Sequence, residues 1–212
     1  MSRTSSKSSG RSRTTGALVS AIAAIAIAPA TAAASTTWFG SSLDHDPANA
    51  GSTCSEDGVG QPGDVCTHVG SDYPGFSGHA KSPVTGTVIA LKLEPAGPIT
   101  FRAEIVSVRK LSSDFKSGQA RATARSRKIT LAGPTQNQIS LQDFPIDTVH
   151  VSLKVRKGQE LAINTASNTA EYCSDSTPGQ LLFDPPLSLG GGFASSAGVD
   201  GCLMLFQAVV RH

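Results

Sequence analysis

The stretch of sequence that decides the fold reads VHVSLKVRKGQELAI and runs from Val149 to Ile163. Apolar residues occupy every second position up to Val155, which is the period of a β-strand with one buried face. The turn Arg156–Gln159 interrupts this alternation, and Leu161 and Ile163 resume it. Because the interruption is short and contains a glycine, the pattern predicts a β-hairpin.

Similar β-branched runs, separated by glycine and proline turns, continue along the chain. No segment after residue 34 has a sustained apolar stripe at every third and fourth position, the mark of an amphipathic helix. Short strands joined by such turns are typical of an antiparallel β-sandwich, and we predict a jelly-roll-like one over residues 79–212. The other predicted strands are Val84–Leu93, Ile99–Val108, Arg121–Leu131, Leu181–Phe183 and Leu203–Val210.

Two of these strands carry signs of irregularity. Gly86 indicates a bulge in the first. In the second, the apolar residues occupy odd positions up to Ile105 and even positions from Val106 onward. A single inserted residue changes the phase in this way, so we predict a β-bulge or a bend between Ile105 and Val106.

The first 34 residues have the composition of a secretory signal peptide. Four basic residues precede an apolar run over residues 17–28, and small residues up to Ala34 provide an Ala-x-Ala cleavage pattern. The run is shorter than the roughly 20 residues of a membrane-spanning helix, and no second run of that length follows. We therefore expect a secreted, extracellular protein that begins near Ser35 and has no transmembrane segment.

The charge of the chain depends on this leader. The leader holds four of the 18 basic residues and none of the 16 acidic ones, so the remainder has 14 basic and 16 acidic residues and a formal charge of −2. A nearly neutral domain lacks the overall positive field typical of nucleic-acid-binding proteins. Nucleic acid is therefore not among the expected partners.

The cysteines of an exported chain are expected to form disulfides, because the extracellular environment is oxidising. The four cysteines allow three connectivities, of which we favour Cys54–Cys66 and Cys173–Cys202, since each pair brackets a loop. A zinc site is the alternative, but the chain has no C-x-x-C pair and its histidines follow no ligand spacing. We predict a disulfide-stapled domain preceded by a loop-rich segment over residues 35–78.

That loop-rich segment is also acidic. Its carboxylates and an asparagine could supply oxygen ligands to a calcium ion, although their order does not match an EF-hand loop. Acidic glycine-rich loops are more often simply solvated, so no cofactor is expected and calcium is the alternative. The residues are Asp44, Asp46, Asn49, Glu56, Asp57 and Asp64.

Glycan binding on a β-sandwich uses exposed aromatic rings, and three polar-tipped aromatics are available. They are Trp38, Tyr73 and Tyr172, which we take as candidate ligand-binding residues. The alternative is that they pack in the core or, for Tyr172, against a disulfide.

The basic run over residues 121–128 offers a second kind of surface. On a regular strand Arg121, Arg125 and Arg127 share one face, which could meet an acidic polymer. The alternative is a solvated face or an edge strand that charge protects from pairing. No aromatic residue interleaves the arginines, which weakens a nucleic-acid interpretation further.

No local motif points to catalysis, and we assign no catalytic residues. The sequence around Ser77 fails the G-x-S-x-G spacing, because Gly78 follows the serine directly. The five histidines form no H-E-x-x-H or H-x-H pair. A catalytic triad assembled from distant residues stays open.

Three segments resemble a group of exported actinobacterial proteins of unassigned function. They are SPVTGTV at Ser82–Val88, LQDFPI at Leu141–Ile146 and VRKGQELAI at Val155–Ile163. The resemblance spans residues 78–210 and implies a jelly-roll sandwich. It implies no catalytic residues, and Gln159 stands where an aspartate is more usual in that group.

These observations favour a secreted, non-enzymatic β-sandwich that acts as an extracellular or envelope-associated binding module, with a glycan or a cell-envelope component as partner. A secreted hydrolase acting on glycans or esters and a purely structural surface protein are the alternatives. A sandwich fold by itself does not decide among them.

Overall fold

The computed structural model describes residues 34–45, 47, 65–70, 78–134, 144–166, 170–173 and 180–212, with the side chains of 171–173 and 200 left out. The predicted Ser77 motif, LQDFPI before Phe144 and most of the loop-rich segment lie outside these residues. Within them the chain is all-β, its sheets are antiparallel and no helix occurs. The predicted fold class is confirmed. No helix in the described part of the chain has the length and apolar character needed to cross a membrane.

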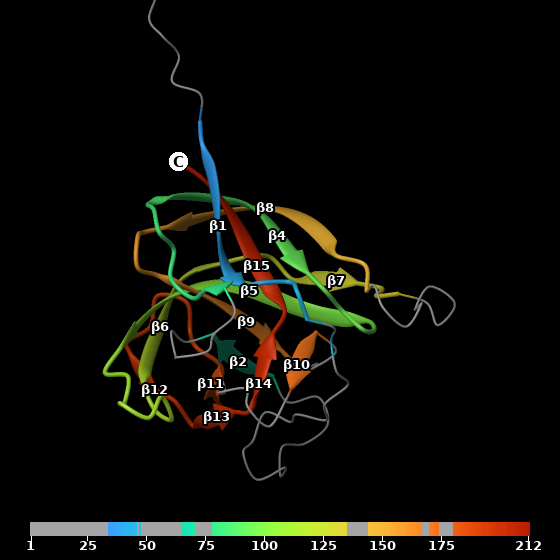
Figure 1. The fold of residues 1–212 in the computed structure, drawn as a ribbon. Helices are drawn as coiled ribbons and strands as arrows, with labels where there is room; N and C mark the ends of the chain where they lie inside the picture. Colours follow the sequence, from blue (N-terminus) through green and yellow to red (C-terminus); the bar gives the residue numbers. More distant parts are fainter. Residues whose placement is uncertain are drawn as a thin grey trace, which may run out of the picture. The chain divides into compact units, whose positions relative to one another are not determined.

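Two sheets form the layers of the sandwich (Figure 1). The first, sheet A, has five strands in the order β3-β1-β15-β4-β8. These strands are β1 Thr36–Ser41, β3 Gly78–His79, β4 Gly86–Leu93, β8 Asp147–Val155 and β15 Phe206–Arg211.

The second sheet, sheet B, has the order β12-β6-β5-β9-β2-β11-β13, and β7 also pairs with β5. Its strands are β2 Cys66–Val69, β5 Ile99–Arg109, β6 Gln119–Arg125, β7 Ile129–Leu131, β9 Glu160–Thr165, β11 Gln180–Phe183, β12 Ala194–Ser195 and β13 Gly198–Asp200. A separate pair joins β10 Glu171–Cys173 to β14 Cys202–Met204.

The connectivity is that of a jelly roll. In chain order the central strands are β1, β2, β4, β5, β6, β8, β9 and β15. Numbered by their place among these eight, the strands of sheet A from β1 to β8 are the first, eighth, third and sixth. The central strands of sheet B from β2 to β6 are the second, seventh, fourth and fifth. This order is the double Greek key of eight-stranded jelly rolls. Its first two strands, β1 and β2, lie in the segment 35–78 that was predicted to be a loop-rich entry, so the sandwich includes strands before residue 79.

The predicted hairpin over Val149–Ile163 is wrong. Strand β8 pairs with β4 in sheet A, whereas β9 pairs with β5 and β2 in sheet B. The turn between them therefore carries the chain from one layer to the other. Alternating apolar residues specify which face of a strand is buried, but both strands point their apolar faces into the same core from opposite sheets.

The other predicted strands are found with changed boundaries. The predicted strand Arg121–Leu131 is divided into β6 and β7, and Leu203–Val210 into β14 and β15. The bulge of β4 lies at Ile89, where the pairing with β15 skips a residue, and not at Gly86. Gly86 instead allows close approach of β15, because a Cβ there would lie 2.4 Å from the Arg211 carbonyl oxygen.

The main core lies between the two sheets and contains side chains from both. Phe101 of β5 meets Phe206 of β15 edge to face, with ring centroids 5.8 Å apart. Phe39, Leu91 and Ile105 are buried around them. Aromatic pairs in this geometry stabilise a core beyond the apolar area they bury.

A second core covers the outer face of sheet B. Val106, Ala162, Leu181 and Phe183 project from the strands, and Leu187 of the following loop packs on them. This cover explains why the apolar phase of β5 changes after Ile105. Residues on both faces of the strand are buried there, so apolar side chains appear at odd and then at even positions.

The register irregularity predicted between Ile105 and Val106 is confirmed. The extra residue belongs to the partner strand, since the pairing of β5 with β6 passes over Thr123. The pairing of β5 with β9 runs through the same two positions without a shift. The bulge is therefore in β6 and changes which way the residues after Thr123 face.

The described cysteine side chains are in disulfide form. Cys66 and Cys202 are both disulfide-bonded, and no described cysteine is free. The backbone of Cys173 lies directly opposite Cys202 across the β10–β14 pair, within the separation that a disulfide bridges. The side chain of Cys173 and all of Cys54 lie outside the described residues, so the favoured connectivity stays a prediction.

A Gly40→Ala substitution is expected to lower the free energy of unfolding by roughly 1–3 kcal/mol through backbone strain alone. Gly40 has a φ of 111°, and a Cβ would lie 2.3 Å from the carbonyl oxygen of Phe206. The urea midpoint would measure the loss. Gly192→Ala is the matched control, because nothing lies within 4 Å of its Cβ position. Equal midpoints for the two variants would contradict the close pairing of β1 and β15.

Candidate functional site

A groove of about 570 Å³ lies where the β8–β9 turn meets strands β5 and β6. Its lining combines cationic side chains, hydroxyl and amide groups, and glycines at the rim. We call it the basic groove and define it by Ser107, Arg121, Ala122, Thr123, Lys154, Arg156, Lys157, Gly158, Gln159, Gly190 and Gly191.

The charge of the basic groove is positive and uncompensated. Arg121, Lys154, Arg156 and Lys157 are all exposed, and no described residue that lines the groove is acidic. None of the four forms an ion pair with a described residue; Lys154 Nζ donates to the Thr87 hydroxyl at 3.2 Å. Charges of one sign gathered in a concave site focus the field there and attract anions.

Gln159 holds the floor of the groove together. Its Oε1 accepts a hydrogen bond from the backbone N–H of Arg156 at 2.8 Å, which closes the turn. Its Nε2 donates to the hydroxyls of Ser107 at 3.1 Å and Thr123 at 2.8 Å. One buried amide therefore ties the β8–β9 turn to β5 and to the bulge of β6.

Arg121 is held in place by an aromatic ring. The guanidinium carbon of Arg121 lies 4.9 Å from the centroid of Phe193, and that of Arg109 lies 3.8 Å from the same centroid. Contacts of this kind orient a guanidinium without neutralising its charge. Arg121 thus remains available to an anion in the groove.

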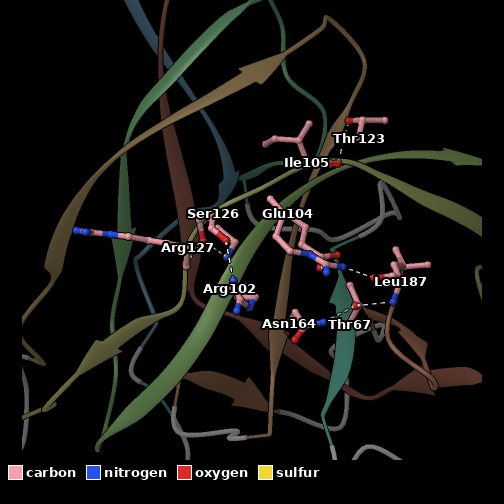
Figure 2. Close-up of polar contacts among 11 residues, drawn as sticks. Thr67, Arg102, Glu104, Ile105, Thr123, Ser126, Arg127, Asn164 and Leu187 are labelled. Carbon is pink, nitrogen blue, oxygen red and sulfur yellow. Dashed lines mark hydrogen bonds and ion pairs between the residues drawn. The ribbon is translucent and has the colours of Figure 1, made fainter. Parts of the chain in front are cut away.

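A buried ion pair lies behind the groove on the outer face of sheet B. Glu104, labelled in Figure 2, is fully buried, and its Oε1 lies 2.6 Å from Nη2 of Arg125. The two residues stand directly opposite each other on β5 and β6. The bulge at Thr123 makes this possible, because it turns Arg125 to the outer face on which Glu104 lies.

The surroundings of Glu104 act on its pKa in opposite directions. Burial raises the pKa of this carboxyl above the usual 4.5, and the Arg125 charge lowers it, as do Thr67 and Asn164 nearby. Burial is the largest of these influences, so the net direction is upward.

The same cluster fixes the loop that forms the rim of the groove. Arg125 Nη2 donates to the carbonyl of Leu187, and the backbone N–H of Leu187 donates to the Thr67 hydroxyl at 3.1 Å (Figure 2). Two residues after this tether, the loop pairs with β6, and the N–H of Gly190 donates to the Ala122 carbonyl at 3.2 Å. The ion pair therefore positions Gly190 and Gly191.

The aromatic candidates are not brought together with the groove. Trp38 lies on β1, half-buried, with its ring 4.7 Å from that of His79. The backbone of Tyr172 lies in β10 opposite Leu203, but its side chain is outside the described residues, as is all of Tyr73.

The expected arginine face is corrected by the structure. Arg121 points into the basic groove, Arg125 pairs with buried Glu104, and Arg127 is exposed after the end of β6. The prediction assumed a regular strand, but the bulge at Thr123 places Arg121 and Arg125 on different faces of it.

Of the acidic residues considered as possible calcium ligands, the structure describes only Asp44. Its Oδ1 accepts a hydrogen bond from the Ser42 hydroxyl and lies 3.5 Å from Nε2 of His45. Its other members lie outside the described residues. Within the described residues no three potential metal ligands lie together.

Three residues of the groove, Lys154, Arg156 and Lys157, were not predicted as site residues from the sequence. The predicted hairpin placed them on its polar face and in its turn, where charges are usually solvated. The available signal was the sign of the charges, because residues 154–157 include three cations and no anion. Their convergence with Arg121 depends on the crossing of the chain between sheets.

No protein-family model, curated protein or solved structure matches this chain. The resemblance to exported actinobacterial proteins stays a prediction.

Glu104→Gln is expected to change how stability depends on pH. Because the pKa of Glu104 is raised on folding, the folded state keeps this proton at pH values where the unfolded chain has released it. The stabilisation that this retained proton provides is complete below about pH 4.5 and is lost as the pH rises through the pKa of Glu104 in the folded state. Wild type should therefore lose more stability than Glu104→Gln between about pH 4 and about pH 7, measured by urea unfolding.

The control for this experiment is Asp114→Asn. The pKa of this exposed carboxyl is lowered, chiefly by hydrogen bonding with the Ser112 hydroxyl, so its shift has the opposite direction to that of Glu104. The pH dependence of the unfolding free energy of Asp114→Asn should therefore differ from that of wild type in the opposite direction to that of Glu104→Gln. Parallel curves for wild type and Glu104→Gln would contradict a raised pKa.

Gln159→Ala is expected to cost roughly 1–3 kcal/mol of unfolding free energy, because it leaves the turn N–H of Arg156 without its side-chain acceptor. Gln119→Ala is the comparison, since that amide bonds Arg109 and Ser195 at the surface and should cost at most about 0.5 kcal/mol. Thermal unfolding of the two variants measures the difference. A smaller loss for Gln159→Ala would show that the groove floor does not depend on its amide.

Proposed function

We propose that this chain is an extracellular, non-enzymatic binding module whose basic groove takes an anionic ligand. The single observation that carries the proposal is the convergence of four exposed cations on one concave site that no described acidic side chain neutralises. The extracellular location rests on the N-terminal leader pattern.

The composition of the groove favours binding over catalysis. The described side chains that line it are guanidinium, ammonium, hydroxyl and amide groups. These groups donate hydrogen bonds and positive charge to carboxylate, sulfate or phosphate. Carboxylate, imidazole and thiol groups, which provide most acid–base and nucleophilic chemistry, are not among them.

The structure around the groove favours a preformed site. Gln159 bonds the turn to the floor, Phe193 orients Arg121, and the Glu104–Arg125 pair holds the rim. A site whose side chains are already placed loses less conformational entropy when a ligand binds.

The test is calorimetric titration of the purified chain with dextran sulfate, polygalacturonate and neutral dextran. We expect binding of the two acidic polymers and not of dextran, with weaker binding as salt rises from about 0.05 M to about 0.5 M. Lys157→Glu should weaken binding about tenfold, equivalent to about 1.4 kcal/mol.

The control variant is Lys116→Glu, which makes the same change of charge on an exposed lysine outside the groove. Its affinity should stay within about twofold of wild type. Equal losses for the two variants would mean that overall charge, and not the groove, determines binding, and would overturn the proposal.

A further inference from the structure

The outward face of sheet A is a second cationic surface. Along β1, β15, β4 and β8 the register places Lys92, Lys154 and Arg211 on this face, with the rings of Trp38 and His150. All five side chains are exposed or half-buried. None of the outward positions of these four strands holds an acidic residue.

The register also places an apolar row beside Trp38 on this face. Trp38 stands opposite Val209, Val209 opposite Ala90, and Ala90 opposite His150. Trp38 is half-buried, and its ring lies 4.7 Å from the ring of His79 on the neighbouring strand β3. A partly exposed ring beside an apolar row can stack on a flat ligand such as a sugar ring.

Cations border this row on both sides. Lys92 lies in the adjacent cross-strand row on one side, and Arg211 and Lys154 lie in the row on the other. Arg211 and Lys154 are two strands apart, which corresponds to about 10 Å at the usual spacing between strands. Charges repeated at such intervals suit a ligand that itself carries repeated charges.

The surface joins the basic groove through Lys154. This residue lies on the outward face of β8 and also lines the groove. Arg156 and Lys157 follow directly in the turn, so positive charge continues from the sheet face into the groove without an intervening anion.

We infer that the anionic ligand is a linear acidic polysaccharide that lies across the outward face of sheet A, stacks a sugar ring on Trp38 and ends in the basic groove. The inference rests on the proposed function and specifies its ligand. A free anion needs only the groove, whereas the cationic rows and the partly exposed Trp38 ring lie well beyond it. Nucleic acid fits less well, because Trp38 is the single tryptophan and residues 35–212 have a formal charge of −2.

The experiment uses oligogalacturonates of increasing length, inorganic sulfate and oligothymidylate. Because the chain has one tryptophan, its intrinsic fluorescence reports on Trp38 alone. Affinity should rise with oligomer length until the face is covered, and long oligomers should shift the tryptophan emission. Inorganic sulfate should bind weakly and leave the emission unchanged.

Trp38→Ala should lower the affinity for long oligomers about tenfold, and Trp38→Phe should restore most of it. If Trp38→Ala does not fold, Lys92→Glu takes its place, because an exposed charge is changed without loss of packing. Thr130→Ala, an exposed substitution on β7 of sheet B, is the control and should leave the affinity as in wild type.

The outcomes separate this inference from the proposed function. Affinity independent of length, with no change in emission, would overturn the extended track, while a continuing effect of Lys157→Glu would keep the groove as the binding site. Loss of that effect would overturn the proposed function itself. Equal or tighter binding of oligothymidylate with the same emission shift would overturn the assignment to a polysaccharide.

Discussion

The ion pair between Glu104 and Arg125 is the interaction on which the rest of this structure depends most. A fully buried carboxylate is costly unless a charge and hydrogen-bond donors compensate it. Here the compensating guanidinium reaches Glu104 only because a residue is inserted at Thr123 of β6. The bulge in β6, the Glu104–Arg125 ion pair and the second core that covers sheet B therefore depend on one another.

The same interaction connects the core of sheet B to the surface. Arg125 also bonds the Leu187 carbonyl, and the loop that starts there reaches Gly190 at the rim of the basic groove. The residue that forms the bulge, Thr123, accepts the amide of Gln159 in the groove floor. The geometry of the groove is thus set by buried polar groups, while its charge is set by exposed ones.

Local charge and overall charge differ in this protein. Residues 35–212 have a small negative formal charge, yet four cations converge on one groove, and two more, Lys92 and Arg211, lie on the outward face of sheet A. Three of the described carboxylates, Glu94, Glu104 and Glu160, are buried and do not stand on this surface. Net charge therefore does not describe the local charge of this surface.

Much of the fold could be predicted from the sequence. The period-two pattern of Val149–Val155, the turns and the lack of a helical stripe determined an antiparallel β-sandwich, and the phase change at Ile105 located an irregularity. Alternation records which face of a strand is buried, and that is a local property. The candidate site was predicted only in part, through the exposed cation Arg121.

The tertiary structure decided which strands pair and which side chains meet. It placed β8 and β9 in different sheets, because two strands with the same alternation can cover one core from opposite sides. It also separated Arg121 from Arg125 and joined Arg121 to Lys154, which lies 33 positions away in the chain. Pairing and convergence depend on contacts between distant residues, and a pattern that repeats every two residues does not encode them.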